Sequence, residues 1–390
     1  MSRNRGLVGL GVGLAAAGVA TAAGIAAGKA SRDRVERLSV LTPEGGFAHT
    51  PDKELVVVAD DGVPLHVEID EPDADATRDG NPTVVFSHGY TLSLRSWVLQ
   101  RKSLSAAGYR CVLWDQRSHG QSGAGSRESC EVDQLGRDLH RVIEEAAPDG
   151  PLVLVGHSMG GMTVMAMAEQ FPDTVSERVV AAAFVATSAG GQDMVNLGFG
   201  QFAGRLIGRL GPGVLNRLGA RQELLWSVRR FGREVEDLIV DHYSFASRVS
   251  QATVRYTGDM IFGTPFTVMA DFLPTLNVHD KQAALEQFHG VETLVLNGMQ
   301  DLLTPPDHSE AIVRLVPGAE HVVVEDAGHI VMLEHPDLVD EQLLELVERG
   351  MRAAATGVQV EGKPRVRRTI TDLAKRRRVA RPRKARRSAS

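Results

Sequence analysis

The feature that most restricts the fold is a serine set among glycines between two patterned segments. Residues 151–156 form an apolar run, PLVLVG, and residues 159–171 have the pattern of a helix. Gly156-His157-Ser158-Met159-Gly160-Gly161 joins them. Such a sharp turn brings strand and helix close together, so a side chain at position 156 or 160 would clash. The segment predicts a nucleophile elbow that exposes Ser158 at a helix N-terminus, where the helix dipole favours developing negative charge.

The rest of the chain alternates in the same way. Several of the apolar runs are continuous, which is typical of parallel strands covered on both faces. Helical patterns lie between them, and this alternation predicts an α/β fold with a mostly parallel, doubly wound sheet flanked by helices. Eight strands are expected, at residues 54–60, 64–70, 82–87, 109–114, 151–156, 178–186, 292–297 and 320–326. Helices are expected at residues 94–107, 133–147, 159–171, 306–315 and 337–355.

One interval interrupts the alternation. Residues 188–288 separate two predicted strands by far more than one crossover needs. Their amphipathic patterns, with Phe199 and Phe202 on one side, predict a helical insertion folded over the C-terminal edge of the sheet. The predicted core of the protein is therefore divided between residues 52–187 and 289–355.

Three further motifs follow predicted strands: His88-Gly89-Tyr90, Asp301 in the segment 298–305, and His329 in Ala327-Gly328-His329. With the elbow, they make residues 52–355 resemble the α/β-hydrolase superfamily, in particular serine lipase- and esterase-like members with a helical cap. The resemblance implies the chain order serine, acid, histidine, and so a catalytic triad of Ser158, Asp301 and His329.

The acid has competitors. Some members of the superfamily carry it after the sixth strand, and Asp193 lies near that position, so Asp193 is the alternative acid. Asp301 itself could instead cap the helix that follows it, as could Asp307.

The resemblance also implies an oxyanion hole formed by the backbone amides of Tyr90 and Met159. The loop 115–122 is similar to a superfamily loop but has Ser118 where glycine is usual, which puts the usual backbone angle there in doubt. We expect a structural role for this loop, and for His157 a role in packing, because adjacent residues at a tight turn point in different directions.

These features predict a hydrolase that cleaves carboxylic esters through an acyl-enzyme intermediate. The apolar insertion favours hydrophobic or lipid-like acyl substrates, with Phe199 and Phe202 as substrate-binding residues. Two alternatives stay open: the same triad used for acyl transfer or cofactor-free perhydrolysis, and a non-enzymatic hydrolase-like scaffold at a membrane. The motifs of metal, nucleotide and dinucleotide sites are absent from the sequence, so no cofactor and no metal are expected.

Both ends of the chain suggest contact with membranes. Residues 6–28 carry no charge and are long enough for a membrane-spanning helix, although many are glycine or alanine. Residues 1–30 are therefore predicted to be an anchor, or a cleaved signal peptide, since Ala20-Thr21-Ala22 resembles a cleavage site. The first reading places the protein at a membrane and the second makes it secreted. Basic residues on both flanks leave the orientation open. A linker is expected at 31–51.

The charge of the chain is divided unevenly. Residues 363–390 hold thirteen Lys or Arg and one acid, while the rest of the chain has a net charge of −18. We expect residues 356–390 to form a disordered basic tail that could contact anionic lipid headgroups. An acidic body argues against nucleic acid as a partner, and two cysteines rule out a disulfide scaffold. The expected substrate is a small ester or lipid; the sequence does not indicate an oligomeric state.

Overall fold

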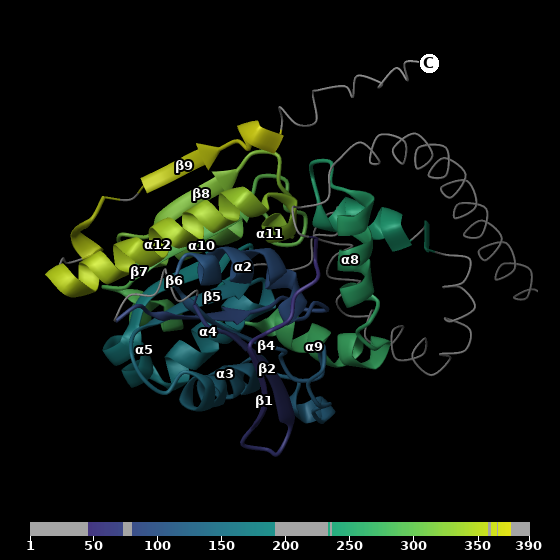
Figure 1. Cartoon of the computed structure of the whole chain (residues 1–390), viewed down its shortest axis with the longest axis horizontal. Helices are drawn as coiled ribbons and strands as arrows, with labels where there is room; N and C mark the ends of the chain where they lie inside the picture. Colours follow the sequence, from purple (N-terminus) through teal and green to yellow (C-terminus); the bar gives the residue numbers. More distant parts are fainter. Residues whose placement is uncertain are drawn as a thin grey trace, which may run out of the picture.

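A nine-stranded sheet runs through the centre of the computed structural model, which describes residues 46–72, 80–191, 233–234, 236–357, 360–364 and 366–375 (Figure 1). The strand order is β1-β2-β4-β3-β5-β6-β7-β8-β9. Strand β2 is antiparallel to both of its neighbours, and all other neighbouring pairs are parallel. The strands are β1 (Lys53–Val58), β2 (Pro64–Asp70), β3 (Thr83–Ser87), β4 (Arg110–Trp114), β5 (Leu152–His157), β6 (Val179–Val185), β7 (Glu292–Gly298), β8 (Glu320–Val324) and β9 (Val366–Ile370).

Helices cover both faces of the sheet. One apolar core lies under α2, α11 and α12, and the other under α3, α4, α5 and α10. Because both faces are covered, every residue of β3, β5 and β7 is buried, as their continuous apolar runs predict. The helices are α2 (Val98–Ala106), α3 (Val132–Ala146), α4 (Met159–Gln170), α5 (Pro172–Arg178), α10 (Pro306–Leu315), α11 (Val331–Glu334) and α12 (Pro336–Thr356).

All eight predicted strands are present, and the predicted helices correspond to α2 with the short turn before it, α3, α4, α10 and α12. The ninth strand was not expected. β9 lies at residues 366–370, inside the segment 356–390 that was predicted to be disordered, so that prediction is wrong for this part. The strand pairs with the edge strand β8, and its arginines find acids on the body: Arg367 lies 3.0 Å from Glu310 and Arg368 lies 2.6 Å from Glu320. These ion pairs offset the repulsion among like charges on which the prediction rested. Residues 376–390 lie outside the described residues.

The insertion begins and ends at a narrow neck. Gly190 and Asp280 form an antiparallel bridge, and the Lys281 amide donates to the carbonyl of Ala189 at 2.7 Å. The insertion therefore spans a shorter stretch than the predicted 188–288, because the turn η3 (Ala283–Phe288) already packs into the core beside β6. Its described part is helical, as predicted, with a helix at 236–244 and with α8 (Gln251–Ile261) and α9 (Phe266–Val278). Residues 192–232, which include Phe199, Phe202 and Asp193, lie outside the described residues.

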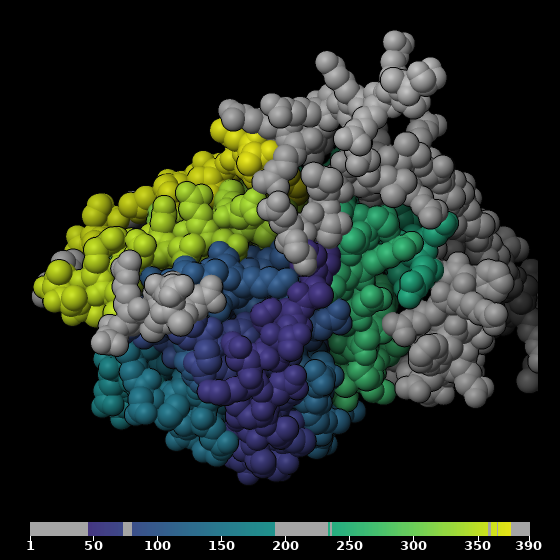
Figure 2. All heavy atoms as spheres, viewed as in Figure 1, coloured from purple at the N-terminus to yellow at the C-terminus, as the bar shows by residue number. Residues whose placement is uncertain are grey.

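The end of the predicted linker packs onto the body of the protein. Phe47 stacks on Tyr256 of α8 with ring centroids 4.1 Å apart, and His49 lies 2.9 Å from Asp70. Figure 2 shows this N-terminal part, in purple, against the green residues of the insertion. Within the described ranges, no helix has the length and apolar character needed to span a membrane. The predicted anchor at residues 6–28 lies outside those ranges.

Candidate active site

The turn between β5 and α4 has the tight geometry that its sequence predicts. Ser158 has φ 52° and ψ −119°, a conformation that non-glycine residues adopt only under strain. A Cβ on Gly156 would lie 2.5 Å from the carbonyl oxygen of Gly160, and a Cβ on Gly160 would lie 2.2 Å from that of Ser87. Since real Cβ atoms do not approach backbone this closely, both positions require glycine. The turn leaves Ser158 partly exposed above the sheet.

Three residues from distant parts of the sequence meet at this turn. His329 Nε2 lies 3.0 Å from Ser158 Oγ, and His329 Nδ1 lies 2.8 Å from Asp301 Oδ2. Asp301 and His329 are buried, with 3% and 5% of their surfaces exposed. The structure thus brings together the serine, the acid and the histidine that the sequence singles out, with the hydrogen-bonding order that a triad needs.

Asp301 follows β7 and is held by four donors. The amides of Leu303 and Thr304 donate to Oδ1 at 2.8 and 2.9 Å, and Thr304 Oγ1 donates to Oδ2 at 2.8 Å, beside the contact with His329. Burial is the largest single influence and raises the pKa of this carboxyl, but the charge of His329 and the hydrogen bonds outweigh it, so the pKa of Asp301 is lowered. The carboxylate is therefore kept ionised beside the imidazole.

His329 lies in the loop after β8, and His157 holds the backbone of this loop through a hydrogen bond. The carbonyl oxygen of His329 accepts a hydrogen bond from His157 Nε2 at 3.0 Å. Burial, with a smaller contribution from the charge of His329, lowers the pKa of His157 to about 3, so His157 is neutral. His157 thus packs beneath the catalytic loop and its side chain does not reach the nucleophile, in agreement with the sequence interpretation.

The predicted oxyanion-hole residues flank the serine. Met159 is the first residue of α4, where an amide has no carbonyl partner within the helix. Tyr90 follows Gly89, whose Cβ, if it had one, would lie 3.2 Å from the Cβ of Ser158. Gly89, the neighbour of Tyr90, and Met159 therefore both lie beside Ser158, and the oxyanion hole formed by the amides of Tyr90 and Met159 stays a prediction.

A buried polar network fixes the loop that carries Tyr90. His88 Nε2 accepts from the amide of Gln116 at 2.9 Å, so the ring proton lies on Nδ1 and is donated to the carbonyl of Gly89 at 2.8 Å. The side-chain amide of Gln116 donates to the carbonyl of His88 at 2.5 Å, and its oxygen accepts from Thr163 of α4 at 2.6 Å. Gln116 and Thr163 therefore connect the Tyr90 loop to α4, the two segments that carry the predicted oxyanion-hole residues. Neither residue was singled out from the sequence.

The loop 115–122 is structural, as expected. Asp115 accepts from the amides of Leu94 and Gln121, both at 2.8 Å, and the buried Arg117 pairs with Asp138 at 2.6 Å. Ser118, which replaces the usual glycine, has φ 66° and so adopts the left-handed conformation. A serine in this conformation, which favours glycine, costs about 1 kcal/mol.

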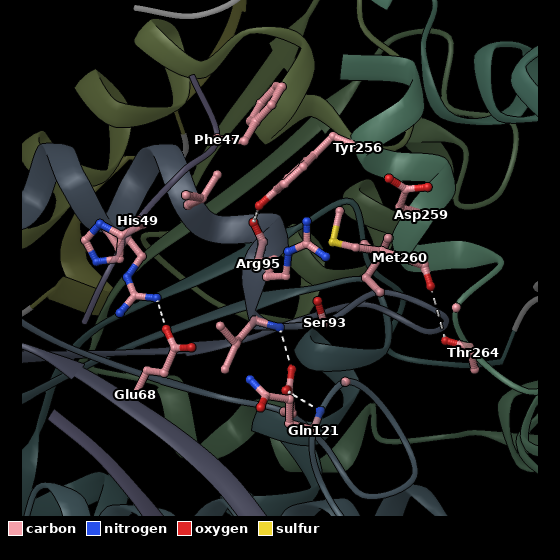
Figure 3. Close-up of a pocket in the computed structure, with 17 residues that line it drawn as sticks. Phe47, His49, Glu68, Ser93, Arg95, Gln121, Tyr256, Asp259, Met260 and Thr264 are labelled. Atoms are coloured by element: carbon pink, nitrogen blue, oxygen red, sulfur yellow. Dashed lines mark hydrogen bonds and ion pairs between the residues drawn. The ribbon is translucent and has the colours of Figure 1, made fainter. Parts of the chain in front are cut away.

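A separate cavity of about 360 Å³ lies between α8 and the segment that follows the Tyr90 loop (Figure 3). Its lining includes Ser93, Arg95, Tyr256 and Asp259, and it contains none of the three triad residues. We therefore do not assign it to the acyl group. Among the residues that the structure describes, no group of three or more His, Cys, Asp or Glu side chains is placed to hold a metal ion.

The sheet order and the triad define a serine hydrolase of the α/β type. The family model described as the alpha/beta hydrolase fold matches residues 82–336, and the chain belongs to this family. The sn-1-specific diacylglycerol lipase ABHD11 of Mus musculus is 28% identical over 292 residues, which cover 71% of this chain and 84% of that protein. A putative non-heme haloperoxidase of Mycobacterium phage D29 is 27% identical over 293 residues, which cover 71% and 95%.

Solved structures share the fold. The bromoperoxidase from Bacillus anthracis aligns with a TM-score of 0.60 at 22% identity, covering 76% of this chain and 100% of its own. The esterase EaEST from Exiguobacterium antarcticum aligns with a TM-score of 0.59 at 19% identity, covering 76% and 100%. These structures show the shared fold, while the family match and the relatives named as lipase and esterase support an ester-hydrolase enzyme.

Proposed function

We propose that this protein hydrolyses carboxylic esters through an acyl-enzyme on Ser158. The observation that carries the proposal is the unbroken hydrogen-bond chain from Ser158 Oγ through His329 to Asp301. A serine hydroxyl is a weak nucleophile at neutral pH and needs such a base, and an ionised acid beside the base stabilises the imidazolium that forms. The same chain of contacts argues against a purely non-enzymatic scaffold.

The reaction follows from the positions of these atoms. Ser158 Oγ attacks the acyl carbon while its proton passes to His329 Nε2, and the carbonyl oxygen becomes an oxyanion that the amides of Tyr90 and Met159 stabilise. The C–O bond to the alcohol then breaks, and His329 gives its proton to the departing oxygen. Water attacks the acyl-enzyme in the same way, with His329 again as base, and releases the acid and free Ser158.

Trapping the intermediate tests this proposal. The full chain is mixed with p-nitrophenyl acetate and quenched in acid during turnover, and its peptides are analysed by mass spectrometry. We expect the acetyl group on the peptide that contains Ser158, and no acetylated peptide with Ser158→Ala. Turnover with the acetyl group on another residue would contradict the assignment.

We propose that the preferred acyl groups are hydrophobic. The lipase name of one relative and the apolar pattern around Phe199 and Phe202 in the insertion support this. Replacing Phe199 or Phe202 with Asp is expected to lower hydrolysis of a long-chain p-nitrophenyl ester more than that of the acetate. Equal losses on both esters would contradict a role in chain selection.

A second candidate function uses a different acceptor for the same acyl-enzyme. One relative is named a putative haloperoxidase, which favours attack by hydrogen peroxide in place of water to give a peroxy acid. Transfer of the acyl group to an alcohol would follow the same course. Product analysis with ester substrate in water, with added peroxide and with added alcohol compares the three acceptors directly. Free acid as the main product under all conditions would leave hydrolysis as the function.

We also propose that the protein associates with membranes through residues 6–28, aided by the basic residues near its C-terminus. The uncharged stretch and the cluster of positive charge support this, because stable attachment often needs two signals. The full chain is then expected to fractionate with membranes and to resist extraction by high salt. Recovery of a shortened chain beginning near Ala23 in the secreted fraction would identify a signal peptide instead.

A further inference from the structure

A buried carboxylate joins the catalytic histidine loop to the insertion. Glu334, at the end of α11, is 2% exposed. Its Oε2 accepts from the amide of Gly328, directly before the catalytic histidine, at 2.7 Å. Its Oε1 accepts from the amide of Ala246 at 2.9 Å, and from the amide and hydroxyl of Ser247 at 2.5 and 2.7 Å. One side chain therefore joins the loop of Gly328 to the segment of Ala246 and Ser247, which lies 81 to 82 residues earlier in the sequence.

The positive charge that opposes the buried Glu334 carboxylate belongs to Lys375, in the C-terminal segment. The segment after β9 (Figure 1) carries Lys375. Lys375 Nζ donates to Ser247 Oγ at 2.6 Å and to the carbonyl of Glu334 at 2.7 Å. A second contact holds the segment in place: Asp372 accepts from the amide of Lys375 at 2.7 Å and lies 3.1 Å from His335 Nδ1. Residues 366–375, inside the segment predicted to be a disordered basic tail, thus bring a partly buried ammonium group to Glu334 and Ser247.

We propose that Lys375 is a positioning residue, which acts through Glu334 and Ser247 to hold the loop of His329 in its catalytic place. The inference rests on the proposed function, because it concerns the base of that reaction. An ionised Glu334 can accept from all four of its donors, whereas a protonated carboxyl group must donate one hydrogen itself. Either the Gly328 amide or the amides of the insertion would then lose their acceptor. The loop of His329 would be held less firmly, and a poorly placed catalytic group lowers the rate.

The charges around the site have a consequence for pH dependence. Burial is the largest influence on Glu334 and raises its pKa, while Lys375 and then His335 oppose that rise. Burial lowers the pKa of Lys375, against the opposing charges of Glu334, Asp372 and Asp326. Without the charge of Lys375, burial raises the pKa of Glu334 further, so Glu334 takes up a proton at higher pH. The acid limb of the kcat profile then moves to higher pH.

Full-chain variants test the proposal. Lys375→Met keeps most of the length of the side chain and removes the charge, Lys375→Arg keeps the charge, and Ser247→Ala is a milder change that removes only the bridging hydroxyl. Arg367→Met is the matched control, because Arg367 lies on the same segment and its ion pair with Glu310 is exposed. The measurements are kcat and KM for p-nitrophenyl acetate against pH, Tm, and hydrogen exchange of the Gly328 amide.

We expect Lys375→Met to lower kcat about tenfold at pH 7 with KM within about twofold, to move the acid limb to higher pH and to speed exchange at Gly328. Ser247→Ala should shift the acid limb in the same direction, Lys375→Arg should restore most of kcat, and Arg367→Met should resemble the unmodified protein.

Two results would overturn the proposal. One is a Lys375→Met variant that matches Arg367→Met in kcat, pH profile and exchange. The other is an equal loss of Tm in Lys375→Arg and Lys375→Met with no shift in the acid limb of the kcat profile. That result would mean that Lys375 has a structural role alone. Exchange at Gly328 does not depend on turnover, so it tests the positioning even if the reaction proves to be a different one.

Discussion

Asp301→Asn isolates the role of the acid, because the neighbours of Asp301 dictate how an asparagine would sit. Two backbone amides, of Leu303 and Thr304, donate to Oδ1. An asparagine must therefore place its oxygen there and its NH₂ group where Oδ2 now faces His329 Nδ1 at 2.8 Å. The NH₂ group can only donate, so Nδ1 becomes an acceptor and the ring proton moves to Nε2. That tautomer cannot take the proton of Ser158.

The loss follows from the wrong tautomer. In a comparable triad the same change lowers kcat by about 10⁴-fold, which corresponds to about 5.4 kcal/mol of transition-state stabilisation. The assay is steady-state hydrolysis of p-nitrophenyl acetate at pH 7, with Tm as a check on folding. Asp307→Asn is the matched control, because it makes the same acid-to-amide change at an exposed residue near the start of α10. An Asp301→Asn variant that keeps more than a tenth of the activity would refute the reasoning and direct attention to Asp193.

Two further predictions address the turn and the stability of the body. Gly160→Ala should abolish measurable turnover, because the new Cβ would lie 2.2 Å from the carbonyl oxygen of Ser87 at the end of β3. Gly362→Ala is the control and should keep full activity in the same assay, because Gly362 has open space around it. Burial, the main influence, raises the pKa of Asp340 to about 7, so native protein holds this proton more tightly than unfolded chain and stability falls as pH rises from about 4 to 7. Asp340→Asn should therefore raise Tm at pH 8 more than at pH 5; an equal change at both pH values would contradict the sign.

The sequence predicts the elements that depend on local pattern. The β-branched runs give all eight of the expected strands, and the glycines of the elbow indicate its tight turn before any contact is known. The triad residues come from the resemblance to the α/β-hydrolase superfamily, whose motifs here follow β5, β7 and β8. The C-terminal ends of parallel strands share one edge of the sheet, which brings these motifs together.

The features that were missed depend on contacts between distant residues. Glu334 has an ordinary position on a helix, and only the folded chain brings Gly328 and Ser247 to its carboxylate. β9 is basic and short, and its stability comes from β8 and from acids on other elements. The hydrogen bond between Gln116 and Thr163 joins a loop to α4 across 47 residues of sequence. A pattern read along the chain has no signal for any of these.

The most direct test of the central claim is labelling of the full chain with a fluorophosphonate probe, followed by identification of the modified peptide. The probe reacts with a serine only where a base activates it, whatever the natural ester is. We predict one modified site, Ser158, with labelling lost in Ser158→Ala and strongly slowed in Asp301→Asn. Labelling that persists in folded Ser158→Ala protein, or an intact chain that does not react at all, would contradict the account.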